Sequence, residues 1–394
     1  MTRFIEFLIA LGLVLVLFLV VGLVLPSKRH LEDSVETNRK MTIVYDTLNN
    51  VRRLKDWSNL LPKHPDELSY SGGDANQSGV GARVDFASKA LPQWKKGSWE
   101  IVESEAPAGT GSPAKVVFAI VDGRPGKDKK TTFDLTPTGK NDRNVKITQR
   151  YDVTYGFNLF GRYMGMYLGS HVGDPMKASL AKLTNLLATV PNFDYRTEGS
   201  KLTDLKLVDV PAEDLLFVNA GNIDRNNDTI KASIKQNQEW IKRVMESNGL
   251  EAAGPVRIVT TDFGAEKYAF DVAQPVRKKS GASAKPADDK AKADEKSDKA
   301  EDKPVETATA SAGALKVSTS GTPVEYVHKD AHKSAYASYT GYMAELDAVR
   351  SALRAWSMTN GHEVTDRPYE SWKSGVDGSF TADGKFDVYW AIKQ

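Results

Sequence analysis

The sequence of 394 residues contains no cysteine. Disulfide bonds, thiolate nucleophiles and cysteine-ligated zinc are therefore excluded. An excess of one charge is also missing, because 53 lysines and arginines stand against 51 aspartates and glutamates. This balance leaves no general basic surface for nucleic acid, so we expect no nucleic-acid partner.

Several catalytic motifs are absent as well. The chain has no G-x-S-x-G, no G-x-x-x-x-G-K-S/T and no H-E-x-x-H, and Gly79-Val80-Gly81 lacks the third glycine of G-x-G-x-x-G. His328, Asp330 and His332 lie near one another, but on an expected turn, where polar residues are usually solvated. The sequence predicts no cofactor, no metal site and no assigned catalytic residue.

Aromatic residues are missing from positions 271 to 325, and Lys278 to Lys303 holds 8 lysines and 7 acidic residues among Ala, Ser and Pro. Such a stretch cannot bury enough apolar surface to offset its chain entropy. Its interspersed signs also argue against a polybasic arm. We expect a disordered insert at 278–314.

One long apolar run is present. Phe7 to Leu25 is 19 residues without a charge, close to the roughly 20 that cross a hydrocarbon core of about 30 Å. A cleaved signal peptide is the alternative, but the run is long for an h-region and no A-x-A-like site precedes Pro26. We predict a transmembrane anchor in 1–26 that contacts the lipid bilayer through residues 7–25.

Basic residues flank the anchor on both sides. Arg3 lies before it, whereas Lys28, Arg29, Arg39 and Lys40 follow it. The positive-inside rule then favours a cytoplasmic body. We expect a single-pass protein of a bacterial inner membrane, with its soluble part leaning to the cytoplasm.

Residues 30–191 have the pattern of an α+β domain. Short alternating runs separated by turn signals such as Asp122-Gly123 predict antiparallel strands. Pro175 to Val190 then carries apolar residues at helical spacing. The economical packing is an antiparallel sheet with one terminal helix laid across it.

This region resembles the SRPBCC superfamily of helix-grip domains, in its polyketide cyclase/dehydrase-like branch. The resemblance implies an apolar cavity between sheet and long helix for a lipid-like or aromatic ligand. An aromatic residue on a strand more often fills a core. The residues that could line the cavity are Trp57 and Trp99, and also Phe86, Trp94, Phe118, Phe133 and Tyr151. Gln149 departs from it, because similar proteins often carry Trp there. The matching segments are Leu25-Pro26-Ser27, Asp56-Trp57, Gly79-Val80-Gly81, residues 96–103, residues 133–137 and residues 173–187.

Residues 204–394 contain a duplication. Ser247-Asn248-Gly249 recurs as Thr359-Asn360-Gly361, and Phe270-Asp271-Val272 recurs as Phe386-Asp387-Val388. Each copy reads as strand, helix, strand, strand. One such unit is marginal alone, so we expect two copies to join about a pseudo-twofold axis and to leave a groove.

The second copy resembles the GyrI-like small-molecule-binding domain, also found as the effector-binding domain of AraC-type regulators. The resemblance implies a binding site for a small effector. The first copy departs from it, because Arg257 stands roughly where Glu370 stands in the second. The matching residues are Thr340-Gly341-Tyr342, Leu346, Leu353, Trp356, Gly361 and Pro368-Tyr369-Glu370-Ser371-Trp372.

Glu370 and Trp372 are the central candidates for a binding site. On a strand they share one face, and aromatic residues of neighbouring strands would complete an arrangement that captures flat or cationic apolar ligands. The alternative is an exposed glutamate, or one paired with Arg257. The aromatic candidates are Tyr336, Tyr339, Tyr389 and Trp390.

The patterns together predict a membrane-anchored protein that binds or senses a hydrophobic or amphipathic small molecule, or a cationic aromatic one. Two alternatives stay open. An enzyme of the cyclase, dehydratase or small-molecule hydrolase type would use Glu370 as general base beside a tyrosine acid, and a scaffold would fill both cavities with its own side chains. Binding accounts for the residues better than turnover.

Replacing Glu370 by glutamine tests the binding site. If the site takes cationic aromatic ligands, Glu370→Gln removes a charge-assisted contact and weakens binding by about 1 kcal/mol or more. Fluorescence titration with a dye-like cation measures this loss. Equal affinity of the two proteins would retire the hypothesis.

Overall fold

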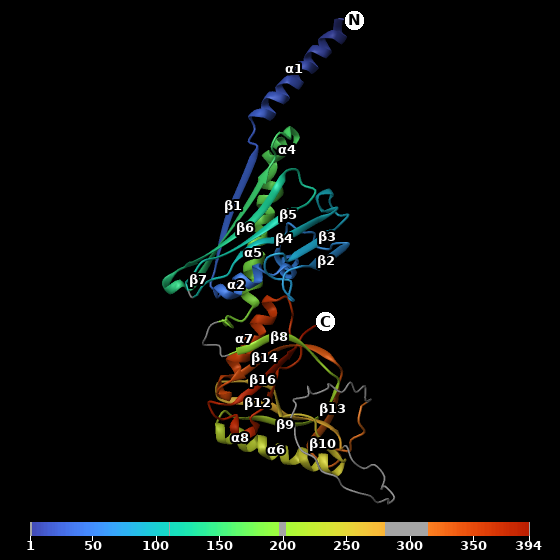
Figure 1. Cartoon of the computed structure of the whole chain (residues 1–394), viewed down its shortest axis with the longest axis vertical. Coiled ribbons are helices and arrows are strands. Elements are labelled where there is room, and N and C mark those ends of the chain that lie inside the picture. The colour runs from blue at the N-terminus through green and yellow to red at the C-terminus, as the bar shows by residue number, and fades with distance from the viewer. Residues whose placement is uncertain (1, 110, 197–201, 280–313, 394) are drawn as a thin grey trace, which may run out of the picture. The chain divides into compact units, whose positions relative to one another are not determined.

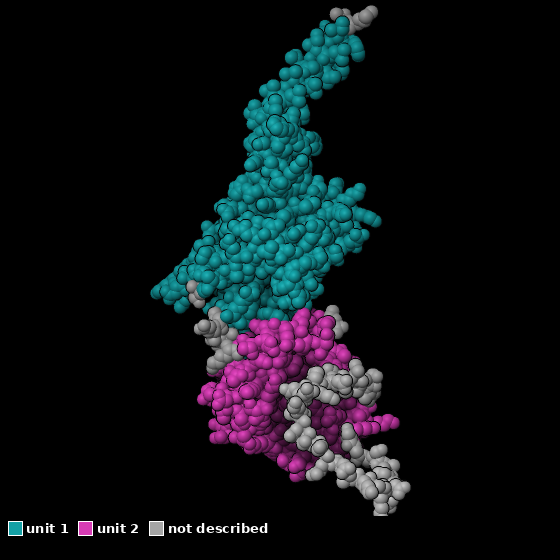
Figure 2. Space-filling view, in the orientation of Figure 1, with its two compact units in different colours: residues 1–200, 348–364 teal, residues 201–347, 365–394 magenta. Residues whose placement is uncertain are grey.

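The computed structural model describes residues 2–109, 111–196, 202–279 and 314–393. The chain forms two compact units (Figure 2). Unit 1 comprises residues 1–200 and 348–364, and unit 2 comprises residues 201–347 and 365–394. Most of the expected insert, residues 280–313, lies outside the described residues. The mixture of helices and antiparallel sheets confirms the predicted α+β class.

Unit 1 begins with the apolar helix α1 (Thr2–Val24). It is the one helix in the described part of the chain that is long and apolar enough to cross a membrane. Its side chains are almost all exposed, unlike those of an apolar helix in a soluble core. This exposure is what a helix surrounded by lipid requires.

The body of unit 1 is an antiparallel sheet packed against a long helix (Figure 1). The strand order is β1-β7-β6-β5-β4-β3-β2. Helix α5 (Asp174–Thr189) packs against β1 and against the short helices α2 (Met41–Leu48) and α3 (Leu54–Trp57). The predicted helix-grip architecture is therefore present. The strands are β1 (Lys28–Thr37), β2 (Glu67–Ser71), β3 (Arg83–Ala87), β4 (Gly97–Glu105), β5 (Ala114–Val121), β6 (Lys127–Thr138) and β7 (Asn144–Thr154).

Aromatic rings fill the space between this sheet and α5. Trp57 meets Phe133 edge to face, with ring centroids 5.5 Å apart, and Phe133 meets Phe118 at 6.1 Å. Trp99 continues the chain of rings at 5.6 Å from Phe118. The predicted helical spacing is seen in the buried side chains of α5, which are Met176, Ser179, Leu180, Leu183 and Leu187.

Unit 2 is built on one nine-stranded antiparallel sheet. Its order is β13-β9-β12-β11-β15-β16-β14-β8, with β10 paired to β12. Three strands at or near its margins, β8, β10 and β13, were not expected from the sequence. The strands are β8 (Leu202–Val210), β9 (Glu213–Asp224), β10 (Leu250–Ala252), β11 (Arg257–Phe263), β12 (Lys267–Lys278), β13 (Val324–Lys329), β14 (His332–Thr340), β15 (Tyr369–Trp372) and β16 (Lys385–Ala391).

The duplication predicted from sequence is visible in the pairing of these strands. The second strands of the two strand–helix–strand–strand copies, β11 and β15, pair with each other near the centre of the sheet. Asp271 lies opposite Val259 in the first copy, and Asp387 lies opposite Ser371 in the second. The repeated Phe-Asp-Val motifs therefore occupy equivalent positions about a pseudo-twofold axis.

The first copy contributes the helix α6 (Asn227–Ser247), which packs on β9 and β12. Asn226 caps its start, because the side-chain oxygen accepts hydrogen bonds from the amides of Asp228 and Thr229. The second copy contributes α7 (Leu346–Thr359), most of which belongs to unit 1. A short helix, α8 (Gly375–Gly378), joins α6 through ion pairs of Lys231 and Lys235 with Asp377.

The aromatic core of unit 1 makes a stability prediction. Phe133 is fully buried between two rings, so Phe133→Ala should lower the free energy of unfolding by about 3–5 kcal/mol. Val121 lies in the same sheet but is 64% exposed, and Val121→Ala should change it by less than about 0.5 kcal/mol. Denaturant titration of the purified full-length protein measures both. Similar losses for the two variants would contradict this account of the core.

Candidate functional site

The loop that follows α3 is held against α5 by hydrogen bonds. The Ser179 hydroxyl, on a buried turn of α5, accepts from the Asn59 amide at 2.8 Å, and the Lys182 ammonium donates to the Asn59 side chain at 2.5 Å. On the other side, the Trp94 indole donates to the carbonyl of Leu60 at 3.2 Å. The start of the loop, at Asn59 and Leu60, is therefore held between helix α5 and the turn that carries Trp94.

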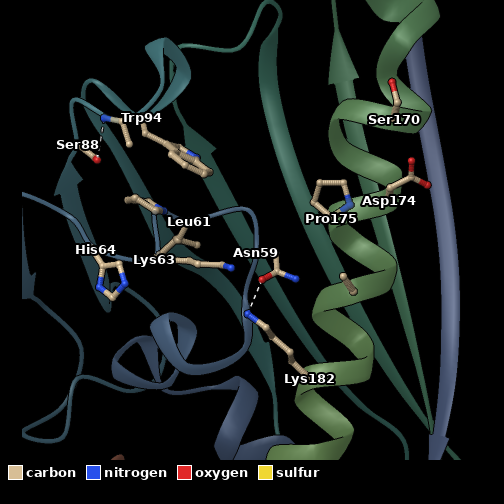
Figure 3. Close-up of a pocket in the computed structure, with 13 residues that line it drawn as sticks. Asn59, Leu61, Lys63, His64, Ser88, Trp94, Ser170, Asp174, Pro175 and Lys182 are labelled. Atoms are coloured by element: carbon tan, nitrogen blue, oxygen red, sulfur yellow. Dashed lines mark hydrogen bonds between the residues drawn. The ribbon is translucent and has the colours of Figure 1, made fainter.

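A cleft of about 670 Å³ opens between this loop and the start of α5. Leu61 and Trp94 lie on one side, and Pro175 lies on the helix opposite them (Figure 3). The volume lies within the range of about 300–1,000 Å³ typical of small-molecule pockets. The walls are mainly apolar, formed by Leu61, Pro62, Ala90, Trp94, Pro175 and Ala178.

Charged groups gather at one part of this cleft. The Lys63 side chain points toward Asn59 and Lys182, whereas Asp174 lies at the start of α5 (Figure 3). Two ammonium groups beside an apolar wall suit a molecule with an anionic group and an apolar body. Among the described residues that line the cleft, none forms a hydrogen-bonded pair of nucleophile and base.

The two tryptophans expected in the helix-grip site lie elsewhere. Trp57 and Trp99 are completely buried in the aromatic core and do not line the cleft. Among the described residues, their indole N–H groups have no hydrogen-bond partner, and neither does the side-chain oxygen of Gln149, which is also fully buried. Such groups each cost about 1–3 kcal/mol unless water or a ligand satisfies them. The role of both tryptophans in ligand binding stays a prediction.

A second cavity in unit 1, of about 200 Å³, lies beside the end of β7. Tyr151 and Tyr155 line it together with Met164, Leu168 and His171. Burial raises the pKa of both tyrosines. Each phenol is therefore protonated at neutral pH and able to donate a hydrogen bond.

Unit 2 carries three tyrosines on one face of its sheet, which we call the tyrosine face: Tyr336, Tyr369 and Tyr389. Tyr369 stacks on Tyr389 with centroids 4.9 Å apart, and Tyr336 follows at 5.1 Å. Cations of the protein itself cover two of the rings. Arg257 lies 4.8 Å from the centroid of Tyr369, and Lys206 lies 5.2 Å from that of Tyr336.

Arg257 is held over the ring by Glu213. Its guanidinium makes two hydrogen bonds to that carboxylate, one of 2.8 Å, and both side chains are largely buried. A bidentate pair of this kind is strong and directional. The expected alternative of an Arg257–Glu370 pair is therefore replaced by the pair with Glu213.

The aspartates of the repeated motifs also lie on the tyrosine face. Asp271 accepts from Asn219 and Arg367, each at 2.7 Å. Asp387 accepts from Ser338 at 3.1 Å, from Tyr336 at 2.9 Å and from Lys373 at 2.8 Å. Each copy thus retains one buried carboxylate with one basic partner. The repeated Phe-Asp-Val motif was the sequence signal that could have identified both.

Glu370 lies on the opposite face of the sheet. Tyr369, and not Glu370, is paired across the strands with Tyr389, and adjacent residues of a strand point to opposite faces. The expected grouping of the Glu370 carboxylate with Tyr336 and Tyr389 is therefore not formed. The register between β15 and β16 separates these groups, because a shift of one residue would move every side chain of the strand to the other face.

The remaining candidates, Trp372, Tyr339 and Trp390, lie on the same face of the sheet as Glu370. Trp372 meets Phe386 at 5.6 Å, and Phe386 stacks on Tyr339 at 5.7 Å. Trp390 is half-buried and donates its indole N–H to the carbonyl of Asp366 at 3.1 Å. Glu370 is fully buried, so it is not directed into bulk water. Its contact with a ligand stays a prediction.

A buried acid that sequence reasoning missed lies in unit 1. Asp46 accepts from the Tyr195 hydroxyl at 2.6 Å and from Arg196 at 2.5 Å. Tyr195 also shares a hydrogen bond of 2.8 Å with Thr359. Burial raises the pKa of Asp46 to about 6, although Arg196 and Tyr195 oppose the shift.

No protein-family model matches the sequence, and no curated protein matches it. Solved structures similar to parts of the chain include a norcoclaurine synthase mutant of Thalictrum flavum (13% identity, 41% of this chain and 94% of that one, TM-score 0.31). They also include the EcmrR C-terminal domain (14% identity, 48% of this chain and 98% of that one, TM-score 0.32). A third is the hypothetical protein jhp0584 of Helicobacter pylori (12% identity, 40% of this chain and 86% of that one, TM-score 0.30). Likeness of this degree transfers no function.

Asp46 makes a prediction about pH. An unfolded aspartate has a pKa of about 3.9, so the folded protein binds more protons between that value and about 6. The contribution of protonated Asp46 to the free energy of unfolding is complete below about pH 4 and is lost as pH rises through about 6. Asp46→Asn stays neutral, and its stability relative to the wild type should rise by roughly 1.4 kcal/mol per pH unit across this window.

Thermal or denaturant unfolding of both proteins between acidic and neutral pH measures this difference. Asp262→Asn is the control, because that side chain is exposed in the folded protein. Parallel stability curves for wild type and Asp46→Asn would show that the buried acid does not titrate as described.

Proposed function

We propose that the protein is a membrane-anchored binding protein for amphipathic small molecules that carry an anionic group. The observation that carries this proposal is the cleft of about 670 Å³ in unit 1, with apolar walls and two lysines. Capture or sensing of a ligand, and not its conversion, is the activity we infer. The geometry supports this binding function better than the cationic-aromatic one, because the protein's own cations already cover two rings of the tyrosine face.

The apolar body of the ligand lies against Leu61, Trp94 and Pro175 in this proposal. Each methylene group removed from water contributes about 0.8 kcal/mol, and the large ring of Trp94 adds area at little entropic cost because its indole is tied to Leu60.

The anionic group lies beside Lys63 and Lys182. Lys182 is already ordered by its hydrogen bond to Asn59, so less side-chain entropy is lost when an anion binds. Asp174 would repel the anion from the other end of the cleft, and its place in the first turn of α5 stabilises that helix. The charges therefore give the ligand one preferred orientation.

Anchoring through α1 adds to the affinity without a new contact. A binding site tethered to a bilayer meets lipophilic compounds at the surface where they concentrate. The membrane, its sidedness and the bacterial setting belong to this proposal, as does the absence of a catalytic role.

Filling the cleft tests the proposal. Ala178 lines the cleft, whereas Ala181 is exposed one turn away and does not line it. Ala178→Trp should weaken binding of a dansyl-labelled fatty acid by about tenfold or more, equivalent to about 1.4 kcal/mol, while Ala181→Trp should leave it unchanged. Fluorescence titration of the full-length protein in amphipol measures both.

The charge is tested separately. Lys182→Met keeps most of the apolar stem and removes the ammonium group. It should therefore weaken binding of the labelled carboxylate more than binding of the matching uncharged amide. Equal affinities of wild type and Ala178→Trp would place the ligand outside this cleft. Equal losses of affinity for the carboxylate and the amide would show that Lys182 does not bind an anionic group.

A further inference from the structure

The segment between β7 and α5 contacts the apolar helix α1. The Tyr163 ring, on α4 (Leu159–Met164), stacks on Phe18 with centroids 4.5 Å apart and an interplanar angle of 10°. The Tyr163 hydroxyl donates to the Phe18 carbonyl at 2.7 Å. Gly22 permits this approach, because a Cβ there would lie 3.2 Å from the Tyr163 ring and 3.3 Å from Leu159.

Arg162 closes the end of α1. Its guanidinium, 7% exposed, donates to the carbonyls of Leu23 at 2.8 Å and Leu25 at 3.1 Å, and also to that of Gly22 at 3.2 Å. These are the carbonyls that a helix end leaves without an intrahelical partner. A cation there also matches the negative end of the helix dipole. Helix α1 is therefore joined to α4 by packing, hydrogen bonds and charge.

The same segment exposes large apolar side chains. Phe157 is 89% exposed, Phe160 65%, Met166 58% and Tyr167 60%. Such a group within eleven residues is unusual on a surface that faces water. The segment is also fixed to the sheet, because Gly161 and Gly165 lie so close to Tyr155 that a Cβ at either would approach its ring within 3 Å.

The contact with α1 gives the depth of this segment. Phe18 lies six residues before the end of α1 at Val24, which corresponds to about 9 Å along a helix. Amphipathic elements that lie in a membrane interface reach about 5–10 Å into it. Aromatic residues are enriched at this level, and Phe157, Phe160, Tyr163 and Tyr167 provide four in one segment.

We propose that residues 156–168 form a second membrane element, which lies in the bilayer interface beside α1 and holds unit 1 against the lipid. The occupant of the exposed apolar surface is the bilayer, because the surface is continuous with α1 through Tyr163 and Phe18. The second cavity, lined by Met164 and Leu168 of this element, then opens next to lipid. This inference rests on the proposed anchoring of α1.

The absence of cysteine allows a direct test with single cysteines in the full-length protein in lipid nanodiscs. An environment-sensitive NBD label is placed at Phe160→Cys or Tyr167→Cys, at Leu13→Cys in α1, or at the exposed Val80→Cys. Quenching is measured with lipids that carry a doxyl group near the head group or near the chain end. Only contact with lipid gives this quenching, so burial against a second copy or a protein partner does not.

Labels at 160 and 167 should be quenched at least about twofold more by the shallow doxyl group than by the deep one, as an interfacial depth requires. The label at 13 should show the reverse order, and the label at 80 should show no quenching. Gly22→Ile forces Tyr163 and Leu159 away from α1 and should reduce quenching at 160. Gly12→Ile, a position with no neighbour within 4 Å, should not.

The outcomes separate the two proposals. Quenching at 13 without quenching at 160 and 167 overturns the second membrane element and leaves the anchor standing. An absence of quenching at 13 overturns the anchoring of α1 itself. Unchanged quenching at 160 in Gly22→Ile shows that the element does not depend on α1 for its position, which contradicts the role assigned to the Tyr163 contact.

Discussion

The packing of α5 on the antiparallel sheet of unit 1 is the constraint on which the proposed sites depend. One face of the sheet is lined with Phe118, Phe133 and Trp99 and must be covered. Helix α2 packs on β5 and β6, and helix α5 packs on β1, α2 and α3 with leucines at helical spacing. The same helix provides Ser179, which fixes the loop of the cleft, and Pro175 and Ala178, which form its wall. Cleft and core therefore share one scaffold.

The helical turns before α5 extend this dependence toward the proposed membrane surface. They run from α4 through Tyr167 and His171 into α5 with no strand between, and Arg162 joins their start to the end of α1. An anchor attached only by a flexible linker would leave the body free to tumble. Here Arg162 binds two carbonyls of α1 and that of Leu25 just after it, and the Tyr163 ring of α4 packs on α1. These contacts keep one end of unit 1 facing lipid in the proposal.

In unit 2, the arrangement depends on the pairing of β11 with β15. It brings the two copies into one sheet and makes their aspartates equivalent. The copies have nevertheless diverged, because Asp271 binds Arg367 whereas Asp387 binds Lys373 and Tyr336. Both aspartates are largely buried on the tyrosine face, whereas Arg367 and Lys373 are partly exposed. Removing either basic partner would leave a buried carboxylate without its compensating charge.

The sequence by itself determined the features that depend on local pattern. The apolar run of α1, the spacing of Leu180, Leu183 and Leu187, and the duplicated strand–helix–strand–strand unit follow from periodicity and repetition. The tertiary structure alone decided which residues meet. Alternation showed that Glu370 and Trp372 share a face, but the register between β15 and β16 placed Tyr369 with Tyr389. Trp57 and Trp99 became core and Trp94 became cleft wall, because covering by α5 is a long-range contact that no local pattern encodes.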